Sequence, residues 1–166
     1  GYFLDKQEVS NRDYAVFCKA TGYPLPPHFT ADGPATGQAE YPVVNVSFYD
    51  ASLYARWLGK RLPTEAEWEY AVKGKEGLEY PWGKEFDKSR CNSSESGIGH
   101  TTPVPQYSNG VSPYGCYDMA GNVLEWCASW YDESLSRRVV RGGSWGNRPM
   151  LLRVSNRDWF LASFRD

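Results

Sequence analysis

The chain has 166 residues, of which 41% are hydrophobic and 23% charged, so it is long enough for one globular domain with a single core. Its net charge of −2 and the absence of a basic cluster argue against nucleic acid as a partner. No apolar run approaches the roughly 20 residues that a membrane-spanning helix needs, so no membrane span is expected.

The first elements in chain order are a short strand and an amphipathic helix. Gly1–Leu4 is aromatic and apolar, which is typical of a strand. Ser10 is placed to cap a helix that buries Tyr14 and Phe17. Gly22 is placed to end that helix, and the loop that follows is long and rich in proline and glycine.

Two further helices follow a second apolar stretch. Tyr41–Val46 resembles a short strand. Ser47 with Asp50, and Thr64 with Glu67, are spaced as capping boxes, so each pair predicts the start of a helix. The first of these helices is expected to bury Ala51, Tyr54, Ala55 and Leu58 and to end at Gly59. The second is expected to bury Trp68, Ala71 and Val72 and to end at Gly74.

The second half of the chain has a different pattern. From Tyr80 onward a glycine or proline interrupts the sequence every few residues, which is typical of loops joined by short strands. Arg138–Arg141 and the residues near Trp145 are expected to be strand ends. The order of helices first and irregular β structure second indicates an α+β fold.

Cysteine and histidine residues are too few and too scattered for a zinc cluster. The four cysteines are Cys18, Cys91, Cys116 and Cys127, and their spacing leaves disulfides and buried free thiols equally open. His28 and His100 have no other ligand type at metal-binding spacing, and both suit an ordinary loop role.

Six segments in order carry a resemblance to a known family. They are residues 5–11 (DKQEVSN), 42–47 (PVVNVS), 59–71 (GKRLPTEAEWEYA), 80–83 (YPWG), 114–126 (YGCYDMAGNVLEW) and 141–145 (RGGSW). Together they resemble the formylglycine-generating, or sulfatase-modifying, family. The resemblance implies a C-type-lectin-like α+β fold over residues 1–166. The family's closing strand, which typically contains Gly-Phe-Arg, has no match here, so we expect a domain without its final strand.

The resemblance does not extend to the family's oxidase chemistry. Members that make formylglycine use two cysteines, shortly after the Gly-Gly-Ser block, to bind copper, because thiolates are soft ligands. Residues 145–153 contain no cysteine, and Met150 is the only sulfur there. We expect no copper and a non-catalytic domain. The alternative is a divergent metal-dependent oxidase or oxygenase that needs a further domain or chain for its metal site.

A calcium site is also implied by the resemblance. In the matching family loop the ligands would be the carbonyls of Ala120, Gly121 and Val123 and the side chain of Glu125. Calcium prefers such all-oxygen sites, and the ion would be structural. The alternative is that Glu125 only accepts hydrogen bonds from buried groups.

A second family calcium site is weaker in this chain. Its matching positions are Asn92, Ser93, Ser96 and Ile98. Ser96 stands where the family carries an aspartate, and this loss removes negative charge that a hard cation favours.

The C-terminal stretch is the expected recognition surface. In a second branch of the same fold, the variable proteins of diversity-generating retroelements, the equivalent stretch binds ligand. The candidate ligand-binding residues are Trp145, Asn147, Arg148, Met150, Leu151, Asp158, Trp159, Phe160, Leu161 and Phe164. Large apolar and arginine side chains suit a protein interface. Trp145, Arg153 and Arg157 also suit a structural role.

These features predict a non-catalytic domain that binds a protein ligand through the Trp145–Phe164 surface. Other macromolecules, glycans among them, are the alternative ligand class. An extracytoplasmic or cell-surface location is expected. The sequence assigns no oligomeric state.

Overall fold

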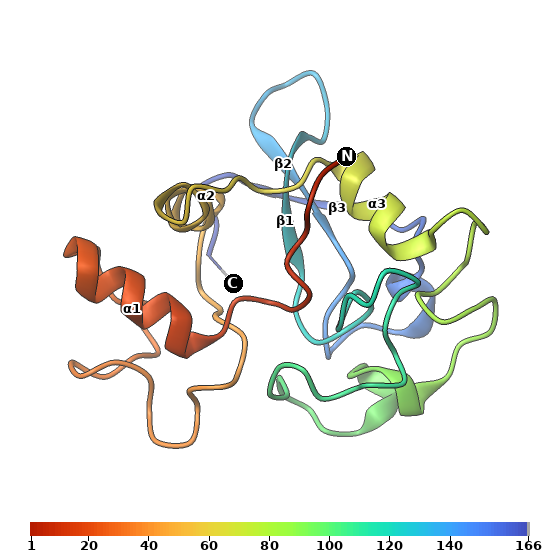
Figure 1. Ribbon diagram of the computed structural model, residues 1–166, viewed down its shortest axis with the longest axis horizontal. Helices are drawn as coiled ribbons and strands as arrows, with labels where there is room; N and C mark the ends of the chain where they lie inside the picture. The colour runs from red at the N-terminus through yellow and green to blue at the C-terminus, as the bar shows by residue number, and fades with distance from the viewer. Residues whose placement is uncertain (166) are drawn as a thin grey trace.

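The computed structural model describes residues 1–165. Figure 1 shows helices from the first half of the chain around a small antiparallel sheet formed by its last third. The α-helices are α1 (Asn11–Thr21), α2 (Phe48–Trp57) and α3 (Glu65–Lys73), and the short 3-10 helices are η1 (Lys88–Arg90), η2 (Ser94–Ser96) and η3 (Pro149–Leu152). The sheet has the order β1 (Glu125–Trp130), β2 (Arg137–Arg141), β3 (Asp158–Leu161). This mixture confirms the predicted α+β class.

The helices begin where their capping residues predict. The Ser10 hydroxyl accepts from the N–H of Asp13 at 3.1 Å, and Gly22 ends α1 with φ at 71°. Thr64 and Glu67 form the reciprocal capping box of α3 through bonds of 3.2 and 2.9 Å. Local hydrogen-bonding chemistry therefore sets these boundaries.

Three segments expected to be strands are not strands. Gly1–Leu4 has no regular secondary structure and pairs with no strand within residues 1–165. Within Tyr41–Val46, Pro42 has no N–H to donate, and Asn45 has a φ of 58°, so the segment makes one isolated bridge. Trp145 lies in a turn that follows two glycines of positive φ. Strands β1 and β3 were not predicted, because neither shows a regular alternation of apolar and polar residues.

The main core lies between α3 and the sheet. Trp68 and Val72 project from α3 onto Cys127 and Val139, and none of these side chains is more than 1% exposed. The buried guanidinium of Arg141 joins the same layers by donating to Glu65 and Glu69 of α3 at 2.9 and 3.0 Å. These contacts hold β1 and β2 in place beside α3.

A second cluster joins α1 to α2. Tyr14 stacks on Tyr54 with ring centroids 5.5 Å apart, and Phe17 packs edge-on against both rings. The prediction that Leu58 lies on the buried face of α2 is wrong, because Leu58 caps the end of the helix and is 40% exposed. No helix in residues 1–165 has the length and apolar character needed to cross a bilayer.

Candidate functional site

One cleft lies between the segment Val43–Val46 and the sheet. It has a volume of about 430 Å³. The rings of Trp126, Trp145 and Phe160 line it, together with Val43, Val44, Asn45, Val46, His100, Thr101, Asn122, Val123, Leu124, Val140 and Ser144. We call this site the aromatic cleft. Its lining includes no carboxylate, lysine or arginine, so contacts within it depend on shape, rings and neutral polar groups.

Trp126 fixes the geometry of the aromatic cleft. Its indole N–H donates to the carbonyl of Val46 at 3.0 Å, which ties the loop before α2 to β1. Its ring meets Phe160 of β3 edge-on, with centroids 6.0 Å apart. Phe160 in turn stacks on Phe164 at 4.7 Å, and Phe164 is 43% exposed. Aromatic surface therefore runs from the cleft out to solvent.

The predicted recognition residues do not form one surface. Trp145 and Phe160 line the aromatic cleft, and Phe164 continues it. Trp159, the neighbour of Phe160 on β3, packs instead beside Tyr131 under the guanidinium of Arg137. Successive side chains of a strand point to opposite faces, which explains this division.

The remaining predicted residues have mixed roles. Met150 and Leu151 are exposed on η3 and do not line the cleft, and Leu161 is exposed on β3. Asn147 is structural, because its side-chain oxygen accepts from the N–H and hydroxyl of Ser144. The exposed residues Arg148 and Asp158 also lie outside the cleft lining.

Trp145, Arg153 and Arg157, for which a structural role was also expected, differ in their surroundings. Arg157 holds Glu65 through two hydrogen bonds of 2.9 and 3.0 Å and is structural, as expected. Arg153 pairs with Glu79 on the surface. Trp145 is 38% exposed and lines the cleft, so its ring is available to a ligand.

The cysteines do not provide a copper site. All four are free and buried, and none lines the aromatic cleft. Burial raises the thiol pKa of Cys91 to about 12 and also raises the pKa values of Cys18, Cys116 and Cys127, so thiolates are disfavoured at neutral pH. The residues present therefore do not fit copper bound by a thiolate pair.

The predicted calcium loop is tightly built. Gly121 has a φ of 92°, and a Cβ there would lie 2.1 Å from the carbonyl oxygen of Asn92, so only glycine fits. Asn122 is fully buried, and its side chain accepts from the N–H of Thr102 at 2.8 Å and donates to Glu8 at 2.6 Å. The carboxylate of Glu125 accepts from the indole N–H of Trp68 at 2.8 Å.

Two carboxylates that the sequence did not single out, those of Asp118 and Glu8, lie near this loop. Both oxygens of Asp118 are buried without a hydrogen-bond partner in residues 1–165. Burial raises the pKa of Asp118 to about 6. Burial is the main reason that the pKa of Glu125 is raised to about 7, and the negative charge of Asp118 adds to this effect. Burial also raises the pKa of Glu8, and the charges of Asp118 and Glu125 add to it. None of the three forms an ion pair within the described residues.

These carboxylates fit a hard cation only if backbone carbonyl groups serve as further ligands. No group of three or more His, Cys, Asp or Glu side chains in residues 1–165 is arranged to hold a metal alone. The orphaned oxygens of Asp118 and the mutual repulsion of the three acids still favour a positive charge nearby. Loop carbonyls would have to supply the remaining ligands, as calcium sites allow.

The weaker predicted calcium site is held together by its own hydrogen bonds. The hydroxyl of Ser96 donates to the carbonyl of Ser93 at 2.6 Å and lies 3.1 Å from the side-chain oxygen of Asn92. The amide of Asn92 donates to the carbonyl of His100 at 2.8 Å. Ile98 takes part in none of these bonds. The other histidine, His28, is structural, with its ring 3.2 Å from the side-chain oxygen of Asn11.

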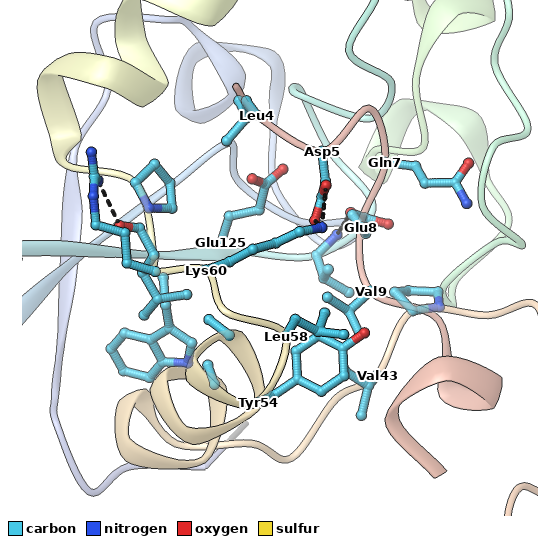
Figure 2. Close-up of a pocket in the computed structure, with 18 of the residues that line it drawn as sticks. Leu4, Asp5, Gln7, Glu8, Val9, Val43, Tyr54, Leu58, Lys60 and Glu125 are labelled. Atoms are coloured by element: carbon cyan, nitrogen blue, oxygen red, sulfur yellow. Dashed lines mark hydrogen bonds and ion pairs between the residues drawn. The ribbon is translucent and has the colours of Figure 1, made fainter. Parts of the chain in front are cut away.

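A second hollow lies on the other side of the same wall. Figure 2 shows this N-terminal groove, of about 500 Å³, between residues 2–9, the end of α2 and the start of β1. Glu8 and Glu125 face it, and an ion pair between Lys60 and Asp5 spans it. The groove and the aromatic cleft share the lining residues Val43, Val46, Val123, Leu124 and Trp126.

Comparison with known proteins gives consistent relatives. Residues 1–166 match the sulfatase-modifying factor enzyme 1-like domain. The serine/threonine-protein kinase Pkn1 of Chlamydia trachomatis is 38% identical over 190 residues, which are 95% of this chain and 30% of that kinase. This chain therefore spans less than a third of the kinase.

Two further relatives carry the name formylglycine-generating enzyme, one of them as an inactive form. The formylglycine-generating enzyme of Thermomonospora curvata is 35% identical over 86% of this chain and 70% of the enzyme. The inactive C-alpha-formylglycine-generating enzyme 2 of Bos taurus is 43% identical over 68% of this chain and 42% of that protein.

Solved structures agree with these relationships. PvdO from Pseudomonas aeruginosa superposes with a TM-score of 0.79 at 29% identity, covering 95% of this chain and 74% of PvdO. Treponema denticola variable protein 1 gives a TM-score of 0.76 at 26% identity, covering 97% and 79% of the two chains.

Proposed function

This chain belongs to the sulfatase-modifying factor enzyme 1-like family, as its six sequence blocks indicated, and we propose that it is a binding domain rather than an oxidase. The observation that carries the proposal is the chemistry of the aromatic cleft. Rings line it, thiols do not, and the cysteines of the chain are buried elsewhere with raised pKa values.

The ligand that best suits this cleft is a protein surface. A hollow of about 430 Å³ that continues into exposed aromatic rings can accept an apolar anchor from a partner. Interface energy is concentrated in such aromatic residues. A relative named inactive and a structural neighbour named a variable protein support a role for this fold without oxidation.

A structural calcium ion is the second part of the proposal. Glu8, Asp118 and Glu125 would provide negative charge, and the carbonyls of Ala120, Gly121 and Val123 would complete an oxygen site. The support is the pair of orphaned Asp118 oxygens beside a loop whose turn requires glycine. Bound calcium would hold the loop that forms one end of the aromatic cleft.

Photocrosslinking tests the binding proposal. A crosslinking residue at Phe164, which stacks on Phe160 and is exposed, captures the partner where the cleft opens to solvent, and its affinity is then measured with purified components. Phe160→Ala should weaken binding by about 2 kcal/mol or more, as loss of a central aromatic anchor does. Leu135→Ala, an exposed site between β1 and β2, should have no effect. Equal affinity for the wild type and Phe160→Ala would reject the cleft as the binding site.

A further inference from the structure

Two pairs of tyrosine rings stack on each other in residues 1–165, and their geometry is almost the same. Tyr70 of α3 and Tyr114 have ring centroids 5.5 Å apart and an interplanar angle of 26°. Tyr14 of α1 and Tyr54 of α2 have centroids 5.5 Å apart and an angle of 27°. Each pair joins two segments that are distant in the chain.

The two pairs differ in their access to solvent. Tyr70 and Tyr114 are 41% and 47% exposed, whereas Tyr14 and Tyr54 are 2% and 9% exposed in the cluster between α1 and α2. Burial also raises the pKa of Tyr54 to about 12, which disfavours loss of its phenolic proton. A reagent in solution therefore has access to the first pair and not to the second.

The exposed pair is held with its reactive atoms close together. A hydrogen bond to Tyr70 is the main reason that the pKa of the Tyr114 hydroxyl is raised, so the two hydroxyls are neighbours. Because the rings are stacked, the ortho carbons beside these hydroxyls are neighbours as well. The loop that carries Tyr114 packs closely on the end of α3, where a Cβ on Gly74 would lie 3.2 Å from the ring of Pro113.

We propose that Tyr70 and Tyr114 are a site of oxidative crosslinking, at which a peroxidase joins the two side chains as dityrosine. Each phenol gives one electron to the peroxidase and one proton to water, which leaves a tyrosyl radical. The two radicals combine in one bond between ortho carbons. Each of these carbons then loses its hydrogen as a proton, and each phenol oxygen regains one. Hydrogen peroxide takes up the two electrons and two protons and becomes two molecules of water.

The crosslink ties α3 to the segment that leads toward β1. The new bond closes a loop from Tyr70 to Tyr114 that includes η1 and η2. A covalent bond between segments distant in the chain restricts the unfolded state and so stabilises the fold. Neither tyrosine lines the aromatic cleft, so this site does not depend on what the cleft binds.

Treatment of the dilute purified protein with a peroxidase and hydrogen peroxide tests the proposal. The expected product is a monomer that is lighter by two hydrogens, shows dityrosine fluorescence and gives one pair of joined peptides, containing Tyr70 and Tyr114. Its Tm should be higher than that of the untreated protein by about 5 °C or more. A monomer without this joined pair, or an unchanged Tm in its presence, would overturn the proposal.

Single-hydroxyl variants identify the reacting rings. Tyr114→Phe should abolish both the joined peptides and the rise in Tm. Tyr54→Phe, the same change in the buried pair, should leave both intact. Tyr2→Phe should do so too, although Tyr2 is 39% exposed and donates to the carbonyl of Glu67 on α3. An equal yield of crosslinked monomer from Tyr114→Phe, or its loss in Tyr2→Phe, would refute the assignment of the site to Tyr70 and Tyr114.

Discussion

The aromatic cleft and the N-terminal groove share one wall but use opposite chemistry. The cleft is lined by rings and neutral polar groups, whereas the groove is lined by apolar side chains with four carboxylates, of which Asp5 and Glu67 pair with Lys60 and Arg61. The cleft is lined by strands that pair with each other, whereas the groove is bordered by residues 2–9, where the carbonyls of Lys6 and Val9 accept hydrogen bonds from the N–H groups of Tyr117 and Val43. Two hollows that share a wall can thus differ in chemistry, because the residues on their other sides come from different segments of the chain.

The largest expected effect concerns the carboxylates beside the groove. If calcium binds there, calcium at 100 times its Kd stabilises the fold by about 2.7 kcal/mol, which raises Tm by roughly 5–10 °C for a chain of this size. Thermal unfolding in calcium and in EDTA measures the shift. Glu125→Gln should remove most of it, and Glu76→Gln, an exposed control, should leave it intact. A calcium effect of equal size in Glu125→Gln would exclude this carboxylate as a ligand.

The pH dependence of that effect has a defined sign. The carboxyl pKa values of Asp118 and Glu125 are raised on folding to about 6 and about 7, so the folded state binds more protons than the unfolded state. Without calcium, stability should therefore fall as pH rises from about 4 through about 7. Calcium competes with these protons, so its stabilising shift should be larger at pH 8 than at pH 5.5. Scanning fluorimetry at both pH values would show an equal or reversed shift if the account were wrong.

A smaller effect is expected at the shared wall. Trp126→Phe removes the indole N–H that binds the Val46 carbonyl while it keeps an aromatic ring. The loss of this bond should lower the free energy of unfolding by about 1–2 kcal/mol, as measured by urea denaturation. Because Trp126 lines the aromatic cleft, affinity for the protein ligand of the cleft should weaken as well. Unchanged ligand affinity in Trp126→Phe would show that this bond does not shape the cleft.

The smallest effect is expected at the mouth of the groove. The ion pair between Lys60 and Asp5 is about half exposed on both sides, with a closest approach of 2.8 Å. Asp5→Asn should change the free energy of unfolding by less than about 1 kcal/mol, because exposed pairs contribute little. A loss of several kcal/mol in urea denaturation would mean that the pair is a structural part of the groove and not a displaceable contact.

The parts of the fold that the sequence predicted correctly are those determined by local chemistry. Ser10, Ser47 and Thr64 each accept a hydrogen bond from the third residue of the helix they begin, so a few residues were enough to locate all three helices. The sheet depends on partners distant in the chain. Among residues 1–165, Gly1–Leu4 has the composition of a strand but pairs with no strand, whereas β3 pairs with β2 despite a weak pattern.

The same reasoning explains what was missed in the candidate sites. Glu125 could be singled out because it ends a compact motif, but Glu8 approaches it only through the fold, by way of the bond from Asn122. The recognition stretch was expected as one surface. The reversal of side-chain direction between Trp159 and Phe160 placed its members on different faces, and spacing alone gave no signal of this division.

The most direct test of the binding account is to analyse the purified protein for metals and to incubate it with a cysteine-containing peptide, copper and oxygen. The account predicts about one calcium per chain, no retained copper, and a peptide whose cysteine is unchanged by mass spectrometry. Copper retained in stoichiometric amount together with an aldehyde at the peptide cysteine would show an oxidase and contradict the account.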